Sequence, residues 1–424
     1  MFQRTLGKEE SEMTKLEQLI NAFCPNGIEY KKLGDIATIS RGGSFQKKDF
    51  TEHGIPCIHY GQIYTRYGLS ADKTITYIDE AAREKAKYAE PNDIVMAVTS
   101  ENVNDVCKCV AWIGSEKVAV SGHTAIIHHN QNAKYLSYYF NSEYFYKQKV
   151  KLAHGTKVIE VTPDKLGDVK LPIPPLEIQR EIVHILDCFT LLTAELTAEL
   201  TARKKQYNYY RDTLLSFDNT VKKVKLKDIA VDIYRGAGIK REEVTETGIP
   251  CVRYGEIYTT YNTWFDACVS HTKLEYVSNP KYFEYGDILF AITGESVEDI
   301  AKSVAYIGNE RCLAGGDIVV LKHNQEPRYL AHVLSTYESR QQKSRGKIKS
   351  KVVHSSVPAI ENIEIPLPSI EVQRRYADIL DNFEKICNDL NIGIPAEIEA
   401  RKKQYEYYRD KLLEFKERGE HDEL

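Results

Sequence analysis

Two stretches of the chain repeat apolar residues at alternating spacings of three and four. This spacing puts the apolar side chains on one stripe of a helix and is typical of long helices that pack against each other. The first stripe consists of Ile182, Ile185, Phe189, Leu192 and Leu196, then Tyr207, Tyr210, Leu214 and Phe217. The second consists of Tyr376, Ile379, Phe383, Ile386 and Leu390, then Tyr405, Tyr408, Leu412 and Phe415. Some forty residues at about 1.5 Å each predict a rod of roughly 60 Å. The alternative is a helix that packs only on its own domain.

The region before each helix has a different pattern. Short apolar runs such as 36–39 and 94–98 are interrupted by Gly, Asn and Asp, which predicts strands between loops. The segment 134–149 is predicted to be helical. Each region ends in an extended exit, marked by Pro172, Pro174 and Pro175 in the first and by Pro366 and Pro368 in the second. The pattern predicts an α+β fold with two globular domains.

The predicted division of the chain follows from these boundaries. It consists of an N-terminal segment (1–23), a first domain (24–174), a first helix (175–217), a second domain (218–368), a second helix (369–416) and a tail (417–424). Gly393 and Pro395 interrupt the second helix, so we expect a kink or break there.

The two halves are copies of each other. Residues 51–65 (TEHGIPCIHYGQIYT) and 245–259 (TETGIPCVRYGEIYT) are identical at eleven of fifteen positions, at an offset of 194. The helices end in ARKKQYNYYRD (202–212) and ARKKQYEYYRD (400–410), which are identical at ten of eleven positions. A repeat this long is a whole domain, since solenoid units have about 20–50 residues. Two like modules predict a pseudo-two-fold binder that reads two neighbouring sites.

A second, shorter repeat lies in the first helix. Residues 193–200 are the tetrapeptide Thr-Ala-Glu-Leu twice in tandem. One such unit lengthens a helix by about 6 Å and turns it about 40° beyond a full turn, which suits an adjustable spacer. The plainer interpretation is a helix that is simply rich in good helix formers.

Composition narrows the class of protein. The 424 residues are 42% hydrophobic and carry a net charge of −4, which excludes a uniformly basic nucleic-acid binder but not a local basic surface. There is no apolar run long enough for a transmembrane helix. Of nine cysteines, only Cys107 and Cys109 lie close together, so we expect reduced thiols, no zinc site and a cytoplasmic location.

Taken together, the two variable domains, the duplicated ARKKQY-x-YYRD helix ends and the Thr-Ala-Glu-Leu spacer resemble the DNA-specificity subunit of type I restriction–modification systems. The opening at 19–35 (Leu-Ile-x-x-Phe-Cys-Pro-Asn-Gly-x-Glu-Tyr-Lys-Lys-Leu-Gly-Asp) and the domain exit at 166–179 are similar too. The resemblance covers nearly all of the chain, apart from residues 1–12 and the tail after Phe415.

The resemblance implies a function for each part. Each domain is expected to be a target-recognition domain that reads half of a bipartite, asymmetric site in double-stranded DNA. The helices are expected to pair antiparallel as a coiled-coil spacer that sets the gap between the half-sites. Two modification subunits, which carry S-adenosylmethionine, are expected to dock on the helices, and restriction subunits to complete the complex. This chain itself is then non-catalytic and holds no cofactor and no metal.

The resemblance also favours partner docking by basic and aromatic residues at the helix ends, although these could touch DNA instead. They are Arg203, Lys204, Lys205 and Tyr209 in the first helix and Arg401, Lys402, Lys403 and Tyr407 in the second.

Polar side chains on loops are candidates for reading DNA, since Arg, Lys, Asn, Gln, Glu and Ser bind base edges or phosphates. The first domain has a Gly-rich loop with Arg41, Ser44, Gln46, Lys47 and Lys48, and the second has Arg235, Lys240 and Arg241 in the matching place. The shared IPCxxYGxIYT stretch adds His59, Tyr60, Gln62 and Tyr64, matched by Arg253, Tyr254, Glu256 and Tyr258.

Within that stretch the framework is kept while two polar positions change. His59 is matched by Arg253, and Gln62 by Glu256. Our hypothesis is that Gln62 favours adenine, Arg253 guanine and Glu256 the amino group of cytosine. The alternative is that these are ordinary solvated surface residues.

A basic segment precedes each domain exit. Residues 340–351 hold six Lys or Arg and no acid, and the first copy has Lys147, Lys149, Lys151 and Lys157 in the same region. Solvated faces are the common explanation of such runs, but their duplication favours phosphate contacts. The expected contacts are Lys157, Arg345, Lys347, Lys349 and Lys351.

Two other functions compete with DNA recognition. An adenine methyltransferase needs an Asn/Asp-Pro-Pro-aromatic motif and a Gly-rich cofactor loop, and the chain has neither. The repeated Thr99-x-Glu101 with Asp105, matched by Thr293-x-Glu295 with Asp299, comes closest to the carboxylates of a nuclease but lacks the accompanying Lys. A protein-interaction scaffold that never touches DNA is the second rival.

Overall fold

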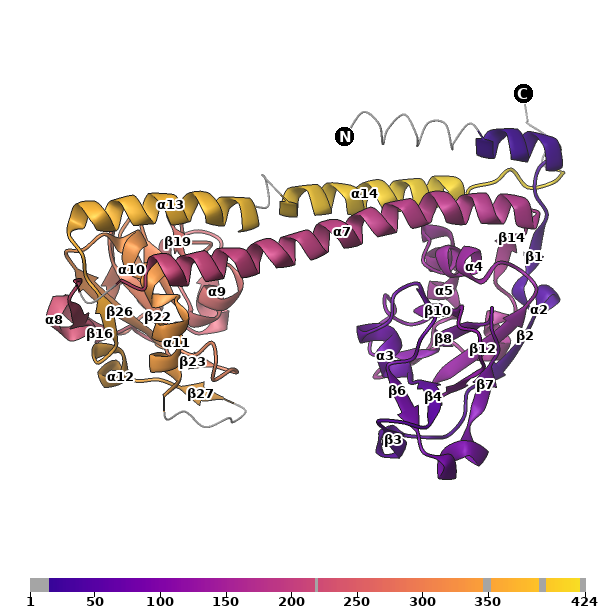
Figure 1. The fold of residues 1–424 in the computed structure, drawn as a ribbon, viewed down its shortest axis with the longest axis horizontal. Helices are drawn as coiled ribbons and strands as arrows, with labels where there is room; N and C mark the ends of the chain where they lie inside the picture. Colours follow the sequence, from indigo (N-terminus) through magenta and orange to yellow (C-terminus); the bar gives the residue numbers. More distant parts are fainter. Residues whose placement is uncertain (1–14, 218–219, 346–351, 389–393, 420–424) are drawn as a thin grey trace. The chain divides into compact units, whose positions relative to one another are not determined.

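A computed structural model describes residues 15–217, 220–345, 352–388 and 394–419 (Figure 1). The chain forms two compact units. Unit 1 consists of residues 1–195 and 399–424, and unit 2 consists of residues 196–398. Each unit therefore joins a globular lobe to segments of the long helices. We call the globular parts lobe 1 and lobe 2. None of the described helices is both long enough and apolar enough to cross a membrane.

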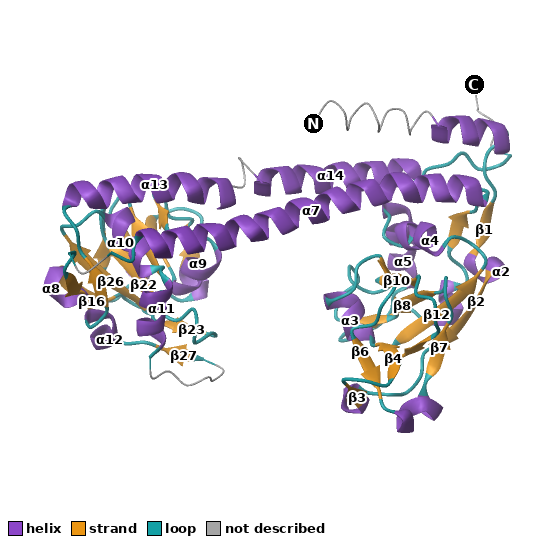
Figure 2. Ribbon diagram, in the orientation of Figure 1, coloured by secondary structure: helices purple, strands orange, loops and turns teal. Residues whose placement is uncertain are grey.

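Lobe 1 is built on two five-stranded sheets (Figure 2). The first has the order β2 (Ala37–Arg41), β12 (Thr124–His129), β8 (Ile94–Ala97), β10 (Cys109–Trp112) and β5 (Ser70–Ala71). The second has the order β3 (Phe50–Thr51), β6 (Thr76–Ile78), β4 (Ile55–Ile58), β11 (Val118–Val120) and β7 (Lys87–Ala89). Strand β8 is buried at every position, as its continuous apolar run predicts. Two small pairs complete the lobe, β1 (Tyr30–Lys32) with β14 (Lys170–Pro172) and β9 (Thr99–Ser100) with β13 (Ile159–Glu160).

Lobe 2 repeats this strand order. Its first sheet has the order β16 (Ala230–Arg235), β26 (Ile318–His323), β22 (Ile288–Ala291), β24 (Ser303–Tyr306) and β19 (Trp264–Phe265). Its second has the order β17 (Val244–Thr245), β20 (Ser270–Thr272), β18 (Ile249–Val252), β25 (Cys312–Ala314) and β21 (Tyr282–Phe283). The small pairs are β15 (Lys223–Lys225) with β28 (Glu364–Pro366) and β23 (Thr293–Gly294) with β27 (Val353–His354). The duplication in the sequence is therefore a duplication of one topology.

Short helices connect the strands in matching places. In lobe 1 they are α2 (Leu33–Ile36), α3 (Tyr60–Thr65), α4 (Ala133–Tyr139), α5 (Glu143–Leu152), α6 (Pro163–Leu166) and the 3-10 turns η1 (Lys47–Asp49) and η2 (Glu80–Lys85). In lobe 2 they are α8 (Leu226–Ile229), α9 (Tyr254–Thr259), α10 (Pro327–Leu334), α11 (Tyr337–Ser344), α12 (Val357–Glu361), η3 (Arg241–Glu243) and η4 (Leu274–Tyr276). The predicted helix at 134–149 is thus two helices, because Asn141 and Ser142 separate α4 from α5 and Ser142 caps α5.

Three long helices follow the lobes. Helix α7 (Leu176–Leu214) begins in unit 1 and ends in unit 2, and its 39 residues agree with the predicted rod. The second predicted helix is described as two, α13 (Ile370–Asn388) and α14 (Ile394–Leu412). Pro395 is the second residue of α14, where proline is tolerated because the first-turn N–H groups have no helical partner. Gly393 and Leu390 lie outside the described residues.

A buried glutamine ties each domain exit to its helix. The Gln179 side chain accepts a hydrogen bond from the N–H of Asn132 at 2.9 Å and donates to the carbonyl of Pro174 at 2.8 Å. Gln373 makes the matching bonds to Glu326 at 3.1 Å and to Pro368 at 2.9 Å. Both glutamines are at most 1% exposed. The shared Leu/Ile-Glu-x-Gln motif therefore fixes the start of each helix on its lobe.

Within each unit, α7 packs beside the other long helix. In unit 1 the rings of Phe189 and Tyr408 stack, with centroids 5.3 Å apart. In unit 2 the ring of Tyr210 lies 6.2 Å from that of Phe383. Tyr207 belongs to the hydrophobic core of lobe 2, so α7 packs on more than its own domain.

The predicted apolar stripe is wrong in part for α13. Ala377 and Leu380 are buried against lobe 2, whereas Ile379, Phe383 and Ile386 are 37%, 43% and 52% exposed. The face that meets the lobe also carries the buried polar residues Gln373, Asp381 and Glu384. A search for apolar residues alone therefore selects the neighbouring stripe.

The C-terminal residues return to the start of lobe 1. The N–H of Ile28 donates to the carbonyl of Lys416 at 2.9 Å, and the N–H of Arg418 donates to the carbonyl of Ile28 at 2.9 Å. In unit 2, β15 is the next element after α7 in the order of the chain, at the matching place. The end of the second helix thus leads into lobe 1 as the end of the first leads into lobe 2.

Candidate nucleic-acid interface

A groove of about 820 Å³ lies on the surface of lobe 1. Three segments line it: the Gly-rich loop 41–48, His59 with Tyr60 at the start of α3, and the turn from Ser121 to His123. The structure therefore brings together Arg41, Ser44, Gln46, Lys47, Lys48, His59 and Tyr60, as the sequence predicts. The turn at 121–123 is a third wall that the sequence analysis missed.

Close packing explains the two glycines of the loop. A Cβ atom on Gly42 would lie 2.0 Å from the carbonyl oxygen of Ser121, and one on Gly43 would lie 2.3 Å from that of Lys85. The N–H of Gly43 donates to the carbonyl of Val120 at 2.7 Å. Glycine at 42 thus lets the loop lie against the turn at 121–123, and glycine at 43 lets it lie against residues 85–87. The loop then ends in η1, which presents Lys47 and Lys48 to solvent.

The polar and charged residues around the groove differ in whether they are engaged in an ion pair. Arg41 is paired with Glu160 of β13, whereas Ser44, Gln46, Lys47 and Lys48 are exposed. Lys157 is exposed on the loop before β13 but does not line the groove. The groove thus offers polar and cationic side chains on a rigid frame, which suits contacts to base edges and phosphates.

The positions that differ in the IPCxxYGxIYT stretch form helix caps. His59 is the N-cap of α3, where Nδ1 accepts from the N–H of Gly61 at 3.2 Å, and the Gln62 side chain accepts from the N–H of His59 at 3.2 Å. His59 is 6% exposed, and burial lowers its pKa. Gln62 is also hydrogen-bonded to Thr76 at 3.1 Å. Gln62 therefore serves the fold first, because its amide already has partners within the lobe.

Lobe 2 uses a charged version of the same cap. Both Glu256 oxygens are occupied: one accepts from the N–H of Arg253 at 3.0 Å, and the other accepts from Ser270 at 2.7 Å and from the Arg253 guanidinium at 3.2 Å. Glu256 is only 7% exposed. This burial argues against the hypothesis that Glu256 contacts cytosine. The signal for a cap was present, since Glu or Gln three residues after the N-cap marks a capping box.

The other predicted DNA-binding residues also form two groups: some are engaged within their lobe, and others are exposed. Tyr64 and Tyr258 donate to the carbonyls of Thr99 at 2.7 Å and Ala291 at 3.2 Å, so their hydroxyls are used within the lobes. Tyr254 is 38% exposed. In the lobe 2 loop, Arg235 is paired with Asp317 at 2.6 Å, Lys240 with Glu243 at 3.7 Å, and Arg241 is exposed.

The basic segments before the domain exits are only partly on the surface. Lys149 is 6% exposed and donates to the carbonyls of Asn104 at 2.7 Å and Val106 at 2.9 Å. Its match Lys343 is 5% exposed and donates to Ser303 at 3.0 Å. These two lysines hold loops inside their lobes, so a phosphate contact by Lys149 is not supported. Arg345 is exposed, and Lys347, Lys349 and Lys351 lie outside the described residues.

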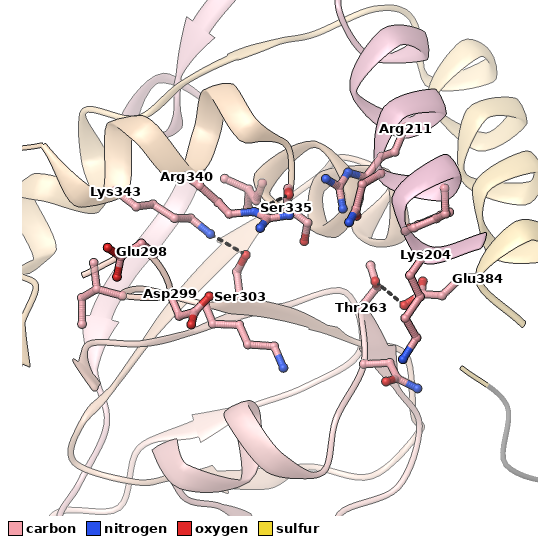
Figure 3. Close-up of a pocket in the computed structure, with 16 residues that line it drawn as sticks. Lys204, Arg211, Thr263, Glu298, Asp299, Ser303, Ser335, Arg340, Lys343 and Glu384 are labelled. Carbon is pink, nitrogen blue, oxygen red and sulfur yellow. Dashed lines mark hydrogen bonds between the residues drawn. The ribbon is translucent and has the colours of Figure 1, made fainter. Parts of the chain in front are cut away.

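Lys343 points into a cavity of about 310 Å³ in unit 2, beside the end of α7 (Figure 3). Burial lowers the pKa of Lys343 to about 7. Arg211 is paired with Asp212 at 2.7 Å, and Lys302 donates to the carbonyl of Tyr261 at 3.2 Å. Arg211, Lys302 and Lys343 are therefore engaged within the unit.

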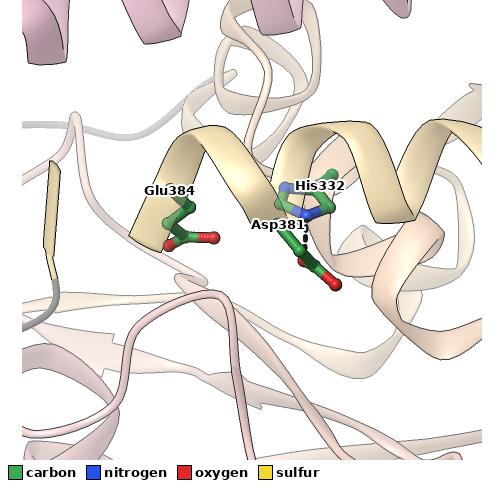
Figure 4. A group of neighbouring side chains, drawn as sticks. All are labelled: His332, Asp381 and Glu384. Atoms are coloured by element: carbon green, nitrogen blue, oxygen red, sulfur yellow. Dashed lines mark hydrogen bonds and ion pairs between the residues drawn. The ribbon is translucent and has the colours of Figure 1, made fainter. Parts of the chain in front are cut away.

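His332, Asp381 and Glu384 form a buried group whose ligand atoms lie within 4.8 Å of one another (Figure 4). His332 bonds through Nε2 to Asp381 at 2.8 Å and through Nδ1 to the hydroxyl of Tyr207 at 3.1 Å. Arg328 also pairs with Asp381, at 2.8 Å. Both ring nitrogens of His332 and both oxygens of Asp381 are used, so the group fits a network that fastens α7, α10 and α13 better than a metal site.

The carboxylates considered for a nuclease do not gather into a site. Asp105 pairs with Lys108 at 2.8 Å, so a lysine does lie beside it, contrary to the expectation from the sequence. Asp105 also accepts from Asn102 at 2.8 Å. Among the described residues, neither Glu101 nor Asp105 belongs to a group with the spacing of metal ligands.

The predicted docking residues lie on the surfaces of the long helices. Tyr209 is 67% and Tyr407 is 61% exposed. Exposed with them are Arg203, Lys204, Lys205, Lys402 and Lys403, and Arg401 is half-buried. Arg203 lies near Glu199, and Lys403 near Glu399, one helical turn away.

Comparisons with known proteins agree with this arrangement. The family model described as the type I restriction modification DNA specificity domain matches twice, over residues 25–203 and 219–400. The type I restriction enzyme EcoR124I/EcoR124II specificity subunit of Escherichia coli is 30% identical, over 96% of this chain and 98% of its own length. A putative type I restriction enzyme specificity subunit of Haemophilus influenzae is 29% identical, over 72% of this chain and 76% of its own.

A solved structure shares the fold. It comes from work on the assembly and conformational transition of a type I R-M system, and it covers 92% of this chain and 98% of its own. The TM-score is 0.63 at 17% identity. The likeness therefore extends over both lobes and the long helices.

Proposed function

This chain belongs to the type I restriction–modification DNA specificity family, and we propose that each of its lobes reads one half of a bipartite, asymmetric DNA sequence. The observation that carries this proposal is the pairing of one topology with two sets of polar residues. The lobes have the same strand order, yet the exposed residues Ser44, Gln46 and His123 of lobe 1 are matched by Gly238, Lys240 and Asp317 in lobe 2. Two readers with different surfaces read two different half-sites.

The groove of lobe 1 supports a proposal in which some residues contact phosphates and others contact base edges. Lys47 and Lys48 are exposed at its rim and suit phosphates, which position a protein on the duplex without reading sequence. The turn at 121–123 and the adjoining loop suit base edges in the major groove. The net charge of −4 is compatible with this division, because only a local cationic surface is needed.

The long helices are proposed to set the distance between the half-sites and to dock two modification subunits. An apolar and aromatic surface on unit 2 supports docking, since Tyr209, Tyr210 and Phe383 are each more than 40% exposed on neighbouring helix faces. Exposed aromatic clusters of this kind mark protein interfaces.

The chain is proposed to perform no chemistry of its own. S-adenosylmethionine and the methyl transfer belong to the modification subunits, and restriction subunits complete the complex in the cytoplasm. The engaged ligands of the His332 group and the separate carboxylates near Asp105 support this assignment.

Sequence selection from random double-stranded DNA tests the proposal. The full chain is assembled with its modification subunit, and the bound duplexes are sequenced. We expect two short conserved blocks of different sequence, separated by a fixed gap. One block, two identical blocks or no enrichment would contradict the proposal. Methylome sequencing of cells that carry both proteins should give the same two blocks.

A second experiment tests docking. Tyr209→Ala and Tyr407→Ala should each weaken binding of the modification subunit by roughly tenfold or more, as is typical of exposed aromatic anchors. Tyr285→Ala is a matched control, because Tyr285 is 62% exposed but belongs to the turn between β21 and β22 of lobe 2 and not to a long helix. Equal binding by all three variants would place the docking surface elsewhere.

A further inference from the structure

His123 occupies an unusual backbone position in the groove of lobe 1. It lies in the turn between β11 and β12 with a φ of 63°, in the left-handed region that is uncommon for residues other than Gly and that Asn, Asp and His adopt more often than the rest. The residue is exposed and lines the groove. Glycine adopts this backbone conformation as readily, so the fold itself does not require an imidazole at this place.

Neighbouring groups hold the turn and the ring in place. The His123 ring lies 5.2 Å from the ring of Tyr60. The N–H of Tyr60 donates to the Ser121 hydroxyl at 2.9 Å, and the carbonyl of His123 accepts from the N–H of Val98 at 2.9 Å. The imidazole is therefore fixed on a rigid frame, as a group that reads a base must be.

The matching position in lobe 2 has opposite chemistry. Asp317 replaces His123, and its carboxylate accepts from Arg235 at 2.6 Å. One hydrogen bond of the turn is kept, since the carbonyl of Asp317 accepts from the N–H of Ile292 at 2.9 Å just as that of His123 accepts from Val98, but Asp317 does not share the positive φ of His123. Between the two lobes, the hydrogen bond that anchors the turn stays, whereas the backbone conformation and the side chain at the tip of the turn change.

We propose that His123 is a specificity-determining residue of lobe 1, whose imidazole N–H donates to an acceptor on the major-groove edge of a purine. This inference rests on the proposed function. Purines present N7, and guanine also O6, as acceptors in the major groove, and even a neutral imidazole keeps one N–H donor. A single donor placed to reach N7 favours a purine at one base pair and leaves the other positions of the half-site to other residues.

His123→Gly tests the proposal without the risk of misfolding, because glycine accepts this backbone conformation. The variant is assembled with the modification subunit and taken through selection from random duplexes. We expect the preference at one base pair of one half-site to disappear and affinity for the selected wild-type sequence to fall roughly tenfold. The other half-site should stay unchanged. His123→Asn should shift the same position toward adenine, which an amide recognises through N6 and N7.

Two controls define the result. His53→Gly removes an exposed histidine of lobe 1 that does not line the groove and should leave the selected sequence intact. Lys48→Ala should weaken binding to all sequences alike. If His123→Gly behaves like either control, the inference is overturned. The wild-type selection separates this failure from failure of the proposed function, in which no bipartite sequence is enriched at all.

Discussion

Phe189 stacks on Tyr408 with ring centroids 5.3 Å apart and planes inclined by 21°, although the two residues belong to different copies of the sequence repeat. Unit 2 contains the matching pair, Phe383 with Tyr210. The helix end that follows one lobe therefore packs on the helix that follows the other. Each unit is completed by residues from both copies, which explains why ARKKQY-x-YYRD is almost identical in the two.

Truncation of the stacked ring should be costly in unit 1. Phe189 is 5% exposed, so Phe189→Ala should lower the free energy of unfolding by about 3–5 kcal/mol. Phe383→Ala is the matched control, and it should cost clearly less because Phe383 is 43% exposed. Calorimetry of both variants measures the difference. Equal losses would mean that the stacking does not secure unit 1.

The cap of α9 should affect stability rather than sequence choice. Glu256→Gln removes the charge that faces Arg253, and we expect the free energy of unfolding to fall by about 1–3 kcal/mol. Glu246→Gln, on an exposed loop, should have no measurable effect. Sequence selection with Glu256→Gln should return the wild-type half-sites. A changed base preference would restore the hypothesis of direct contact by Glu256.

The lowered pKa of Lys343 predicts that the free energy of unfolding rises with pH. Its pKa is lowered to about 7 in the folded protein from an ordinary 10.5. Between these values the unfolded chain holds the proton that the folded chain has released, so raising the pH favours folding. Below pH 7 both states are protonated and the penalty is constant. From pH 7 to 9, the wild type should therefore gain stability relative to Lys343→Met in urea unfolding, whereas exposed Lys147→Met should parallel the wild type.

The rim of the lobe 1 groove should govern the salt dependence of DNA binding. Each lost phosphate contact lowers the slope of log K against log salt by about 0.9. Lys47→Ala and Lys48→Ala should each reduce the slope by about this amount and leave the selected sequence unchanged. Lys73→Ala, an exposed lysine outside the groove, is the control. An unaltered slope in both rim variants would remove these lysines from the interface.

The duplicated domains and the long helices could be predicted well, because a repeat and a regular apolar spacing can be recognised directly in the order of the residues. The repeat at an offset of 194 became one topology twice, and the stripe through Ile182, Ile185 and Phe189 is buried as expected. The same reasoning failed on α13, where Gln373 and Asp381 share the buried face with Ala377. Buried polar residues with hydrogen-bond partners are invisible to a search for apolar periodicity.

The candidate site was predicted less completely. The loop at 41–48 and the turn at 121–123 are brought together by β2 and β12, which are distant in sequence, so the loop was predicted and the turn was not. Lys149 and Lys343 looked like surface charges, since a basic run does not reveal which members face inward. Gln62 and Glu256 vary together with His59 and Arg253 because each pair must complete its own cap.

The hydrogen bonds between Ile28 and the segment around Lys416 have a topological consequence. They close the polypeptide into a quasi-ring, in which the covalent order of the halves is arbitrary. A circularly permuted gene, in which residue 424 is joined to residue 1 and the chain is opened between α7 and β15, should encode the same fold with lobe 2 first.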